Sequence, residues 1–343
     1  MLKKILKSNE FITFAVIILL SVIIGSLNPA FFALATVFDI LRASIVFSIM
    51  AFGVLLVIIS GGVDISFVAM AALAAYATHT FLLGQGYQGG IGLYFLIAVP
   101  IGMLAGLLNG FLVTRFKLPI FNVSLATYTM WYGFIRFFIG SIRSFTLPAG
   151  AADFYNQFLI KVKDPFVGDS GLHVSVIFVL VIGILIHLLL KYTTLGRGIY
   201  AMGGNRDVAI RSGFNVNGIT LVVLMIMGGL AAFSGITYSF LSRLFDPTMF
   251  LPQNLDVIAA VILGGASITG GRGSVLGTFM GVILIQLIHR SMILTGIPTE
   301  WQDLMIGILL VFFISIPFIR DQINKRRAVK VRPTAMDESR ATQ

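Results

Sequence analysis

Apolar runs of about 20 residues recur along this chain and constrain its fold more than any other feature. A helix of that length crosses the hydrocarbon core of a bilayer, because it rises about 1.5 Å per residue. The chain is 57% hydrophobic and only 11% charged, far below the share of charged residues in a soluble domain. The runs are continuous rather than alternating, which argues against a transmembrane barrel. We therefore expect an all-α polytopic membrane protein.

The runs predict about ten transmembrane helices within one domain, residues 1–320. The expected spans are 11–27, 41–59, 66–83, 91–114, 119–140, 172–190, 221–241, 255–268, 274–294 and 304–319. Residues 141–171 are expected to form a long polar loop. Residues 321–343 read as a basic, disordered tail on the cytoplasmic side, since they have little to bury.

The net charge of +10 is placed as a membrane protein requires, and not as in a nucleic-acid-binding protein. Most of the 24 Lys and Arg residues fall at the N-terminus, in short loops on one side, and in the tail. Cytoplasmic loops carry such an excess of basic residues. We expect both termini in the cytoplasm, lipid around the spans, and no nucleic-acid partner.

The polar passage at 191–220 stands out between apolar runs. It contains Lys191, Arg197, Arg206 and Arg211 against one acid. Asn205 can cap a short amphipathic helix that Gly213 ends in a left-handed conformation. Within it, Ala209 is small enough to let the helix backbone approach a partner. On pattern alone this is either a loop that only sets topology or a docking helix, and the pattern favours the first.

Two glycine breaks interrupt apolar runs, Gly61-Gly62 within 59–66 and Gly264-Gly265 within 262–269. The two octets share four identical positions, and matched broken helices often mark a transport pathway. In the ten-span order both breaks have the same orientation, whereas an inverted repeat needs opposite ones. Either the topology near residue 60 differs or the match is a coincidence.

Asp64 is the one carboxylate that the spans place well inside the apolar body. An acid within a membrane is costly, which makes it a candidate for the translocation path. Alternatively, Asp64 is the N-cap of the helix that begins near residue 66. The position directly before a long helical run favours capping.

Further path candidates are polar or aromatic residues inside expected spans. Aromatic residues crowd 128–138, which favours an interfacial belt, although some rings could instead stack on a sugar. The amides and hydroxyls could line a wet path or bond to a neighbouring helix, the commoner role. The candidates, besides Asp64, are Asn109, Asn122, Thr127, Tyr128, Trp131 and Gln286.

Several chemistries are missing from the sequence. The four histidines are scattered without metal-ligand spacing, and there is no cysteine, so we expect no metal site. No phosphate-binding loop of the G-x-x-x-x-G-K-[ST] type occurs, so the chain has no visible means of hydrolysing ATP. We expect no cofactor and no catalytic residue.

Three motifs carry a family resemblance that covers nearly the whole chain. They are TLGR at 194–197 with YAMGGN at 200–205 and SGF at 212–214, ISGGVDIS at 59–66, and VILGGASITGGRGS at 261–274. Together they resemble the permease subunits of bacterial ABC importers for simple sugars. The resemblance implies a type II importer-like fold in the bacterial inner membrane.

The resemblance also implies partners and a role. In that family the polar loop is where the ATPase subunit docks, which favours the docking interpretation of 191–220. A second permease subunit, identical or related, and a soluble substrate-binding protein would complete the importer. The substrate would be a pentose, hexose or related furanoside, with nucleosides or branched-chain amino acids as alternatives. The docking loop would include Gly196, Arg197, Gly203, Gly204, Asn205, Arg206, Ala209, Arg211 and Gly213.

Two classes outside this family remain as alternatives. An intramembrane lipid-modifying enzyme would need clustered acids, histidines or phosphate ligands at one membrane face, and the sequence shows no such cluster. A passive channel would conduct without an ATPase subunit or a binding protein.

Overall fold

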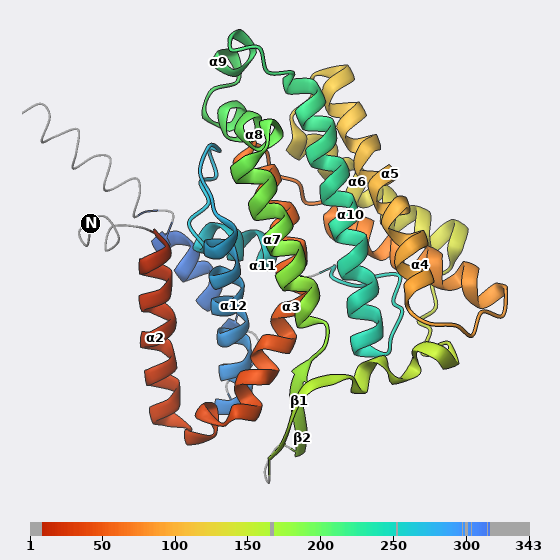
Figure 1. Ribbon diagram of the computed structural model, residues 1–343, viewed down its shortest axis with the longest axis vertical. Helices are drawn as coiled ribbons and strands as arrows, with labels where there is room; N and C mark the ends of the chain where they lie inside the picture. Colours follow the sequence, from red (N-terminus) through yellow and green to blue (C-terminus); the bar gives the residue numbers. More distant parts are fainter. Residues whose placement is uncertain are drawn as a thin grey trace, which may run out of the picture.

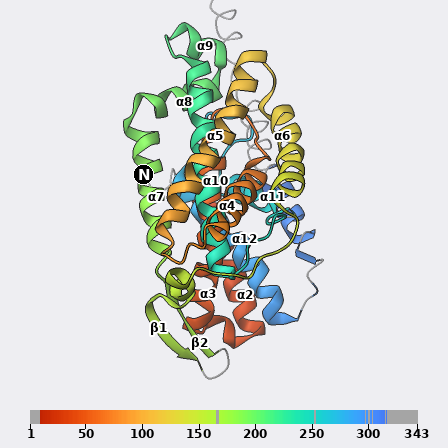
Figure 2. The same cartoon turned by 90° about the vertical axis from the view of Figure 1, so that its right-hand side faces the viewer.

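The computed structural model describes residues 9–164, 168–251, 253–296, 298, 301–302, 304–313 and 315. The expected basic tail at 321–343, and the end of the expected tenth span, lie outside these residues. Within them the chain is a bundle of long helices with α9 at one end and a β-hairpin at the other (Figures 1 and 2). These are called the α9 end and the hairpin end below.

Among the residues that the structure describes, six helices are long and apolar enough to cross a membrane. A seventh candidate is the pair α7 (Val176–Tyr192) and α8 (Thr194–Gly204), which is bent by 73°. The prediction of a helical, multi-pass protein is confirmed. Within the described residues, length and composition support six or seven spans, and the predicted count of ten is not confirmed. The six are α2 (Asn9–Leu27), α3 (Leu34–Ile59), α4 (Phe67–Gly84), α5 (Gly92–Phe116), α10 (Val216–Ser242) and α12 (Val275–Thr295).

Three other expected spans are shorter in the structure. The fifth consists of α6 (Ile120–Phe134) and a π-helical turn, Ile135–Ile139, that ends at Gly140. The eighth is α11 (Asn254–Leu263), and the described part of the tenth is the helix Leu304–Phe313. The last two are below the length that a straight crossing needs, whereas α6 and its π-helical turn together cover 20 residues, 15 and 5, which is enough for one.

The centre of the bundle is formed by α3, α4, α5 and α10. The most extensive helix pair is α5 with α10. A Cβ atom on Gly102 of α5 would overlap the carbonyl oxygen of Gly228 on α10. Small residues at this contact let the two backbones touch, as is common between membrane helices. Around this pair, α4 and the C-terminal half of α3 are almost completely buried.

The expected polar loop at 141–171 is folded, which corrects the all-α prediction. It contains a 3₁₀ helix, Ala149–Asn156, and an antiparallel hairpin of β1 (Phe158–Asp164) and β2 (Gly168–His173). Strand β1 alternates apolar and charged side chains over Ile160, Lys161, Val162 and Lys163, the period of a strand.

Candidate functional site

The polar passage folds into two helices, α8 and α9 (Arg206–Arg211). The side chain of Asn205 accepts hydrogen bonds from the N–H groups of Asp207 and Val208, at 3.0 and 3.1 Å. Gly213 has φ +85° and closes the helix. The predicted cap and the predicted left-handed end of the short helix are therefore confirmed.

Helix α8 was not expected from the sequence. Thr193 begins it by accepting a 3.0 Å hydrogen bond from the N–H of Gly196. Four glycines within its eleven residues lower helix propensity, which is why the sequence favours a loop here. The seventh span also begins earlier than predicted, because Asn215 caps α10 by accepting from the N–H of Gly218.

The structure buries Ala209 of α9, which was predicted to face a partner. Ala209 is buried, with 1% of its surface exposed, so it packs inward and cannot bring the helix close to a partner. Its neighbours Val208 and Ile210 are exposed instead, at 56% and 54%. Arg206 and Arg211 are exposed beside them, and Arg197 is exposed on α8. The surface of α9 is thus an apolar pair flanked by two cations.

The two glycine breaks end α3 and α11 in the same way. Gly61 has φ +87° and Gly265 has φ +93°, which are left-handed conformations that favour glycine. The N–H of Gly62 donates to Val57 O, and the N–H of Ala266 donates to Val261 O. Structurally, therefore, Gly61 corresponds to Gly265 rather than to Gly264, one residue away from the sequence match.

Both breaks lie together at the α9 end. A Cβ atom on Gly270, just after the second break, would lie 2.9 Å from the Cα of Gly61. An inverted repeat would place the breaks at opposite ends, so this arrangement does not support one. The remaining two glycines serve close packing: a Cβ on Gly62 would overlap Ile120, and one on Gly264 would overlap the carbonyl oxygen of Gly277.

A cleft of about 430 Å³ opens beside the first break. It lies between the end of α3, the start of α6 and α8. Its walls include apolar side chains such as Val63, Val113 and Ile120, together with the backbone of Gly61 and one cation, Arg206.

Asp64 and Asn109 are brought together by Ser66. One carboxylate oxygen of Asp64 accepts from the N–H and the hydroxyl of Ser66, at 2.7 and 2.6 Å. The amide of Asn109 donates to the same hydroxyl at 2.8 Å. Within the described part of the chain, Asp64 Oδ2 and Asn109 Oδ1 have no hydrogen-bond partner. The cluster therefore presents two buried acceptor oxygens.

The prediction that Asp64 is the N-cap of α4 is wrong. The N-cap residue is Ser66, and its own side chain does not cap the helix. Asp64 lies two residues earlier and holds the Ser66 N–H, a turn that Asp side chains commonly make.

The other path candidates do not form one cluster. On α6, Asn122 is exposed, and buried Thr127 bonds to the carbonyl oxygen of Val123. Tyr128 and Trp131 are half-buried on the same helix. Gln286 is buried on α12, which packs on α2, α3 and α11, whereas α6 packs on α4 and α5.

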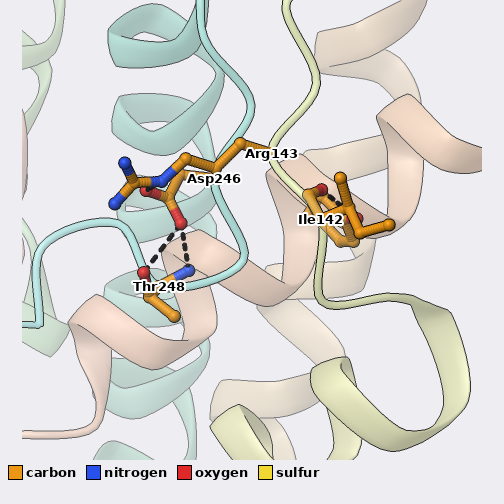
Figure 3. Close-up of polar contacts among 5 residues, drawn as sticks. Ile142, Arg143, Asp246 and Thr248 are labelled. Atoms are coloured by element: carbon orange, nitrogen blue, oxygen red, sulfur yellow. Dashed lines mark hydrogen bonds and ion pairs between the residues drawn. The ribbon is translucent and has the colours of Figure 1, made fainter.

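A second arrangement, unforeseen from the sequence, joins two loops beyond α6 and α10. Ser144 and Phe245 exchange two backbone hydrogen bonds of 2.9 Å. The guanidinium of Arg143 lies 2.7 Å from Asp246, whose other oxygen accepts from the N–H and hydroxyl of Thr248 (Figure 3). We call residues 142–146 and 244–251 the loop crossing.

The loop crossing rests on α4 through side chains. The Tyr76 hydroxyl donates to the carbonyl oxygen of Ile142 at 2.7 Å. His79 Nε2 lies 2.8 Å from the Ser144 hydroxyl, and its ring stacks on Phe245 with 3.8 Å between ring centres. No pattern in the sequence predicts the pairing of Arg143 with Asp246, because the two residues meet only when α6 and α10 are in place.

Metal chemistry receives no support from this geometry. Among the residues that the structure describes, no three His, Asp or Glu side chains are grouped to hold a metal ion. His79 and His173 are both engaged with hydroxyls and packed against aromatic rings.

Comparison with known proteins gives a consistent match over most of the chain. A family model described as branched-chain amino acid transport system / permease component matches residues 36–314. The autoinducer 2 import system permease protein LsrC of Enterobacter sp. (strain 638) is 30% identical over 90% of this chain and 86% of its own length.

Two ribose import permease proteins are similar to the same extent. The one from Haemophilus influenzae is 30% identical over 89% of this chain and 91% of its own length. The one from Bacillus subtilis is 29% identical over 85% and 87%. No solved structure gave a match.

Proposed function

We propose that this chain, which belongs to the branched-chain amino acid transport system / permease component family, is the membrane-spanning permease subunit of an ATP-driven importer for a simple sugar. The observation that carries the proposal is the match to ribose and autoinducer 2 import permeases over most of both chains. The multi-pass helical fold is what such a role needs. Hydrolysis of ATP then belongs to a partner subunit.

The chemistry of the buried cluster favours a sugar over an amino acid. Asp64 Oδ2 and Asn109 Oδ1 have no hydrogen-bond partner within the described residues, and a carboxyl and an amide oxygen suit sugar hydroxyls, which both donate and accept. An amino acid would also need a cation or a set of N–H donors for its carboxylate, and this cluster has no cation. Thr127, Tyr128 and Trp131 on α6 and Gln286 on α12 are proposed as separate parts of the path, since they form no single cluster with Asp64 and Asn109.

The α9 end is proposed as the docking site for the ATPase subunit. The loop 191–220 ends the bundle there, and its exposed pair Val208 and Ile210 can enter an apolar groove while Arg206 and Arg211 meet acidic groups. Ten membrane crossings, counting α6, α11 and the last helix, put the α9 end and both termini in the cytoplasm. The hairpin end then faces outward, towards a substrate-binding protein, and a second permease subunit completes the path.

Topology is tested by single cysteines, because the natural chain has none. Asp207→Cys on α9 and Asp153→Cys in the 3₁₀ helix are both at exposed positions. A membrane-impermeant thiol reagent added to intact cells should label position 153 and leave position 207 unlabelled until the cells are opened. Labelling of both from outside would contradict the orientation.

Transport is tested in proteoliposomes that contain the chain, the ATPase subunit and the binding protein encoded with it. Labelled ribose should accumulate only with ATP, and labelled leucine should not. Accumulation of leucine and not ribose would move the substrate to branched-chain amino acids. Flux without ATP would indicate a passive channel. Loss of ribose uptake in Trp131→Ala, with normal protein abundance, would support its place in the path.

A further inference from the structure

Three separate segments of the chain meet at the α9 end through their backbones. The N–H of Gly271 donates to the carbonyl oxygen of Ile59 at 2.8 Å. The Cα of Gly203, on α8, lies against the same carbonyl group: a Cβ atom there would overlap Ile59 O and lie 2.6 Å from the nitrogen of Gly271. We call Ile59, Gly61, Gly203, Gly270 and Gly271 the glycine junction.

The junction has no room for side chains. A Cβ atom on Gly270 would lie 2.7 Å from the carbonyl oxygen of Gly203 and 2.9 Å from the Cα of Gly61. Gly61, Gly270 and Gly271 also have φ values of +87°, +86° and +72°, which disfavour other residues. Because no flexible side chain separates the three backbones, one segment cannot move far without the other two.

Gly204, the residue after Gly203, shows that the need for glycine is limited to the positions in contact. A Cβ atom on Gly204 would meet nothing within 4 Å. Of two consecutive glycines in the same helix turn, therefore, only the first is required by contact. Gly84, the last residue of α4, lies outside the docking loop, and a Cβ atom there would likewise meet nothing within 4 Å, so it supplies the control.

A side chain adds a further tie between α8 and the second break. The hydroxyl of Tyr200 donates to the carbonyl oxygen of Gly273 at 2.8 Å. Gly273 itself packs against Leu55 and Ile59 of α3. Helix α8 is thus joined to the end of α3 and to the segment that leads into α12.

We propose that the glycine junction transmits movement of the docking loop to both helix breaks at once, so that α8, the α3–α4 break and the α11–α12 break shift as one body. This rests on the proposed function, since it assigns how a docked ATPase acts on the path. The α3–α4 break leads within five residues to Asp64, and α12 carries Gln286. One displacement at α8 therefore reaches path candidates on two sides of α3. The glycines are positioning residues and touch no substrate.

The test compares Gly203→Ala with Gly84→Ala in the full importer. Three properties are measured: co-purification of the ATPase, melting temperature in detergent, and substrate-stimulated ATP hydrolysis. Gly84→Ala, outside the docking loop, should match the natural chain in all three. Gly203→Ala should still bind the ATPase, because α9 is unchanged, but lose at least tenfold in stimulated hydrolysis and uptake. Full stimulation in Gly203→Ala would overturn the proposal.

A second variant decides the matter if Gly203→Ala fails to fold. Tyr200→Phe removes the bond to Gly273 without adding an atom, and should lower stimulation several-fold with docking and melting temperature retained. Its control is Tyr155→Phe in the 3₁₀ helix, a tyrosine outside the docking loop whose hydroxyl has no hydrogen-bond partner within the described residues. Equal stimulation in the two tyrosine variants would contradict transmission through the junction.

Failure of this inference is distinguishable from failure of the proposed function. If the natural chain binds no ATPase and shows no stimulated hydrolysis, the proposed function itself is wrong. If the natural chain is stimulated while Gly203→Ala and Tyr200→Phe behave like their controls, the importer stands and only the junction loses its role.

Discussion

The two ends of the bundle are held together by different kinds of contact. At the α9 end, the glycine junction joins three segments through backbone atoms with no side chain between them. Nearer the hairpin end, the loop crossing has two backbone hydrogen bonds between Ser144 and Phe245, and its remaining contacts are made by side chains, among them Arg143, Asp246, Tyr76 and His79. The three backbones at the junction touch directly, whereas the loops of the crossing are joined by separate bonds that can break one at a time.

That difference suits the two ends to different tasks. Each neutral side-chain hydrogen bond contributes about 1 kcal/mol, and a bond to a charged group about 1.5–3 kcal/mol. Each bond at the loop crossing can therefore break at a modest cost. The glycine junction is held chiefly by direct contact among three backbones, which cannot separate without opening a gap, so it is the end that carries movement. We expect substitutions at the loop crossing to change the stability of the protein and the ease with which its two loops separate. Substitutions at the glycine junction should change the coupling between the ATPase and the path.

The largest effect at the crossing is expected from Asp246→Ala. The change removes the partner of Arg143 and the acceptor of two Thr248 donors, leaving a half-buried N–H unpaired. We expect a loss of about 2–4 kcal/mol in unfolding free energy, seen as a lower melting temperature in detergent. Co-purification of the ATPase should be unchanged, because the α9 end is untouched.

The control for that variant is Asp153→Ala, which removes an exposed carboxylate in the 3₁₀ helix. It should leave the melting temperature within the error of the natural chain. Equal melting temperatures for Asp246→Ala and Asp153→Ala would mean that the Arg143–Asp246 pair does not hold the crossing.

A smaller effect is expected from pH, through His173 in β2 at the hairpin end. Burial lowers the pKa of His173, and the nearby Arg42 lowers it further, while the hydrogen bond to the Phe154 carbonyl raises it. Its pKa in the unfolded chain is about 6.5. Below that value the unfolded chain binds more protons than the folded one, so stability falls as pH decreases.

Melting temperature should therefore drop between pH 7.5 and pH 5.5, and His173→Gln should reduce that drop. His187→Gln, at an exposed position on α7, is the control and should leave the drop unchanged. An undiminished drop in His173→Gln would show that His173 does not carry the dependence.

Local signals in the sequence were enough for the polar loop but not for the contacts between distant segments. The Asn205 cap and the Gly213 end follow from residues a few positions apart, so they could be predicted. Arg143 and Asp246 meet only after α6 and α10 pack, and no periodic pattern in the sequence predicts this ion pair. Burial of Ala209 likewise depends on what lies behind α9. The hairpin was missed because loop length and mixed charge hid the short alternation in β1.

The broken helices illustrate the same limit. The glycine pairs identified where α3 and α11 end, and both ends are left-handed as glycine permits. Which glycine takes that conformation could not be read from the octet match, which is offset by one residue from the structure. Contact between Gly61, Gly203 and Gly270 required the tertiary arrangement.

The most direct test of the account measures movement at both ends in one preparation. Paired spin labels are placed at 204 and 268 across the junction, and at 145 and 251 across the loop crossing, all at exposed positions of a cysteine-free chain. Distances are compared between the nucleotide-free importer and one trapped with ATP. If the junction moves as one body, the 204–268 distance stays constant while the 145–251 distance changes. A changed distance across the junction with an unchanged crossing would contradict the account.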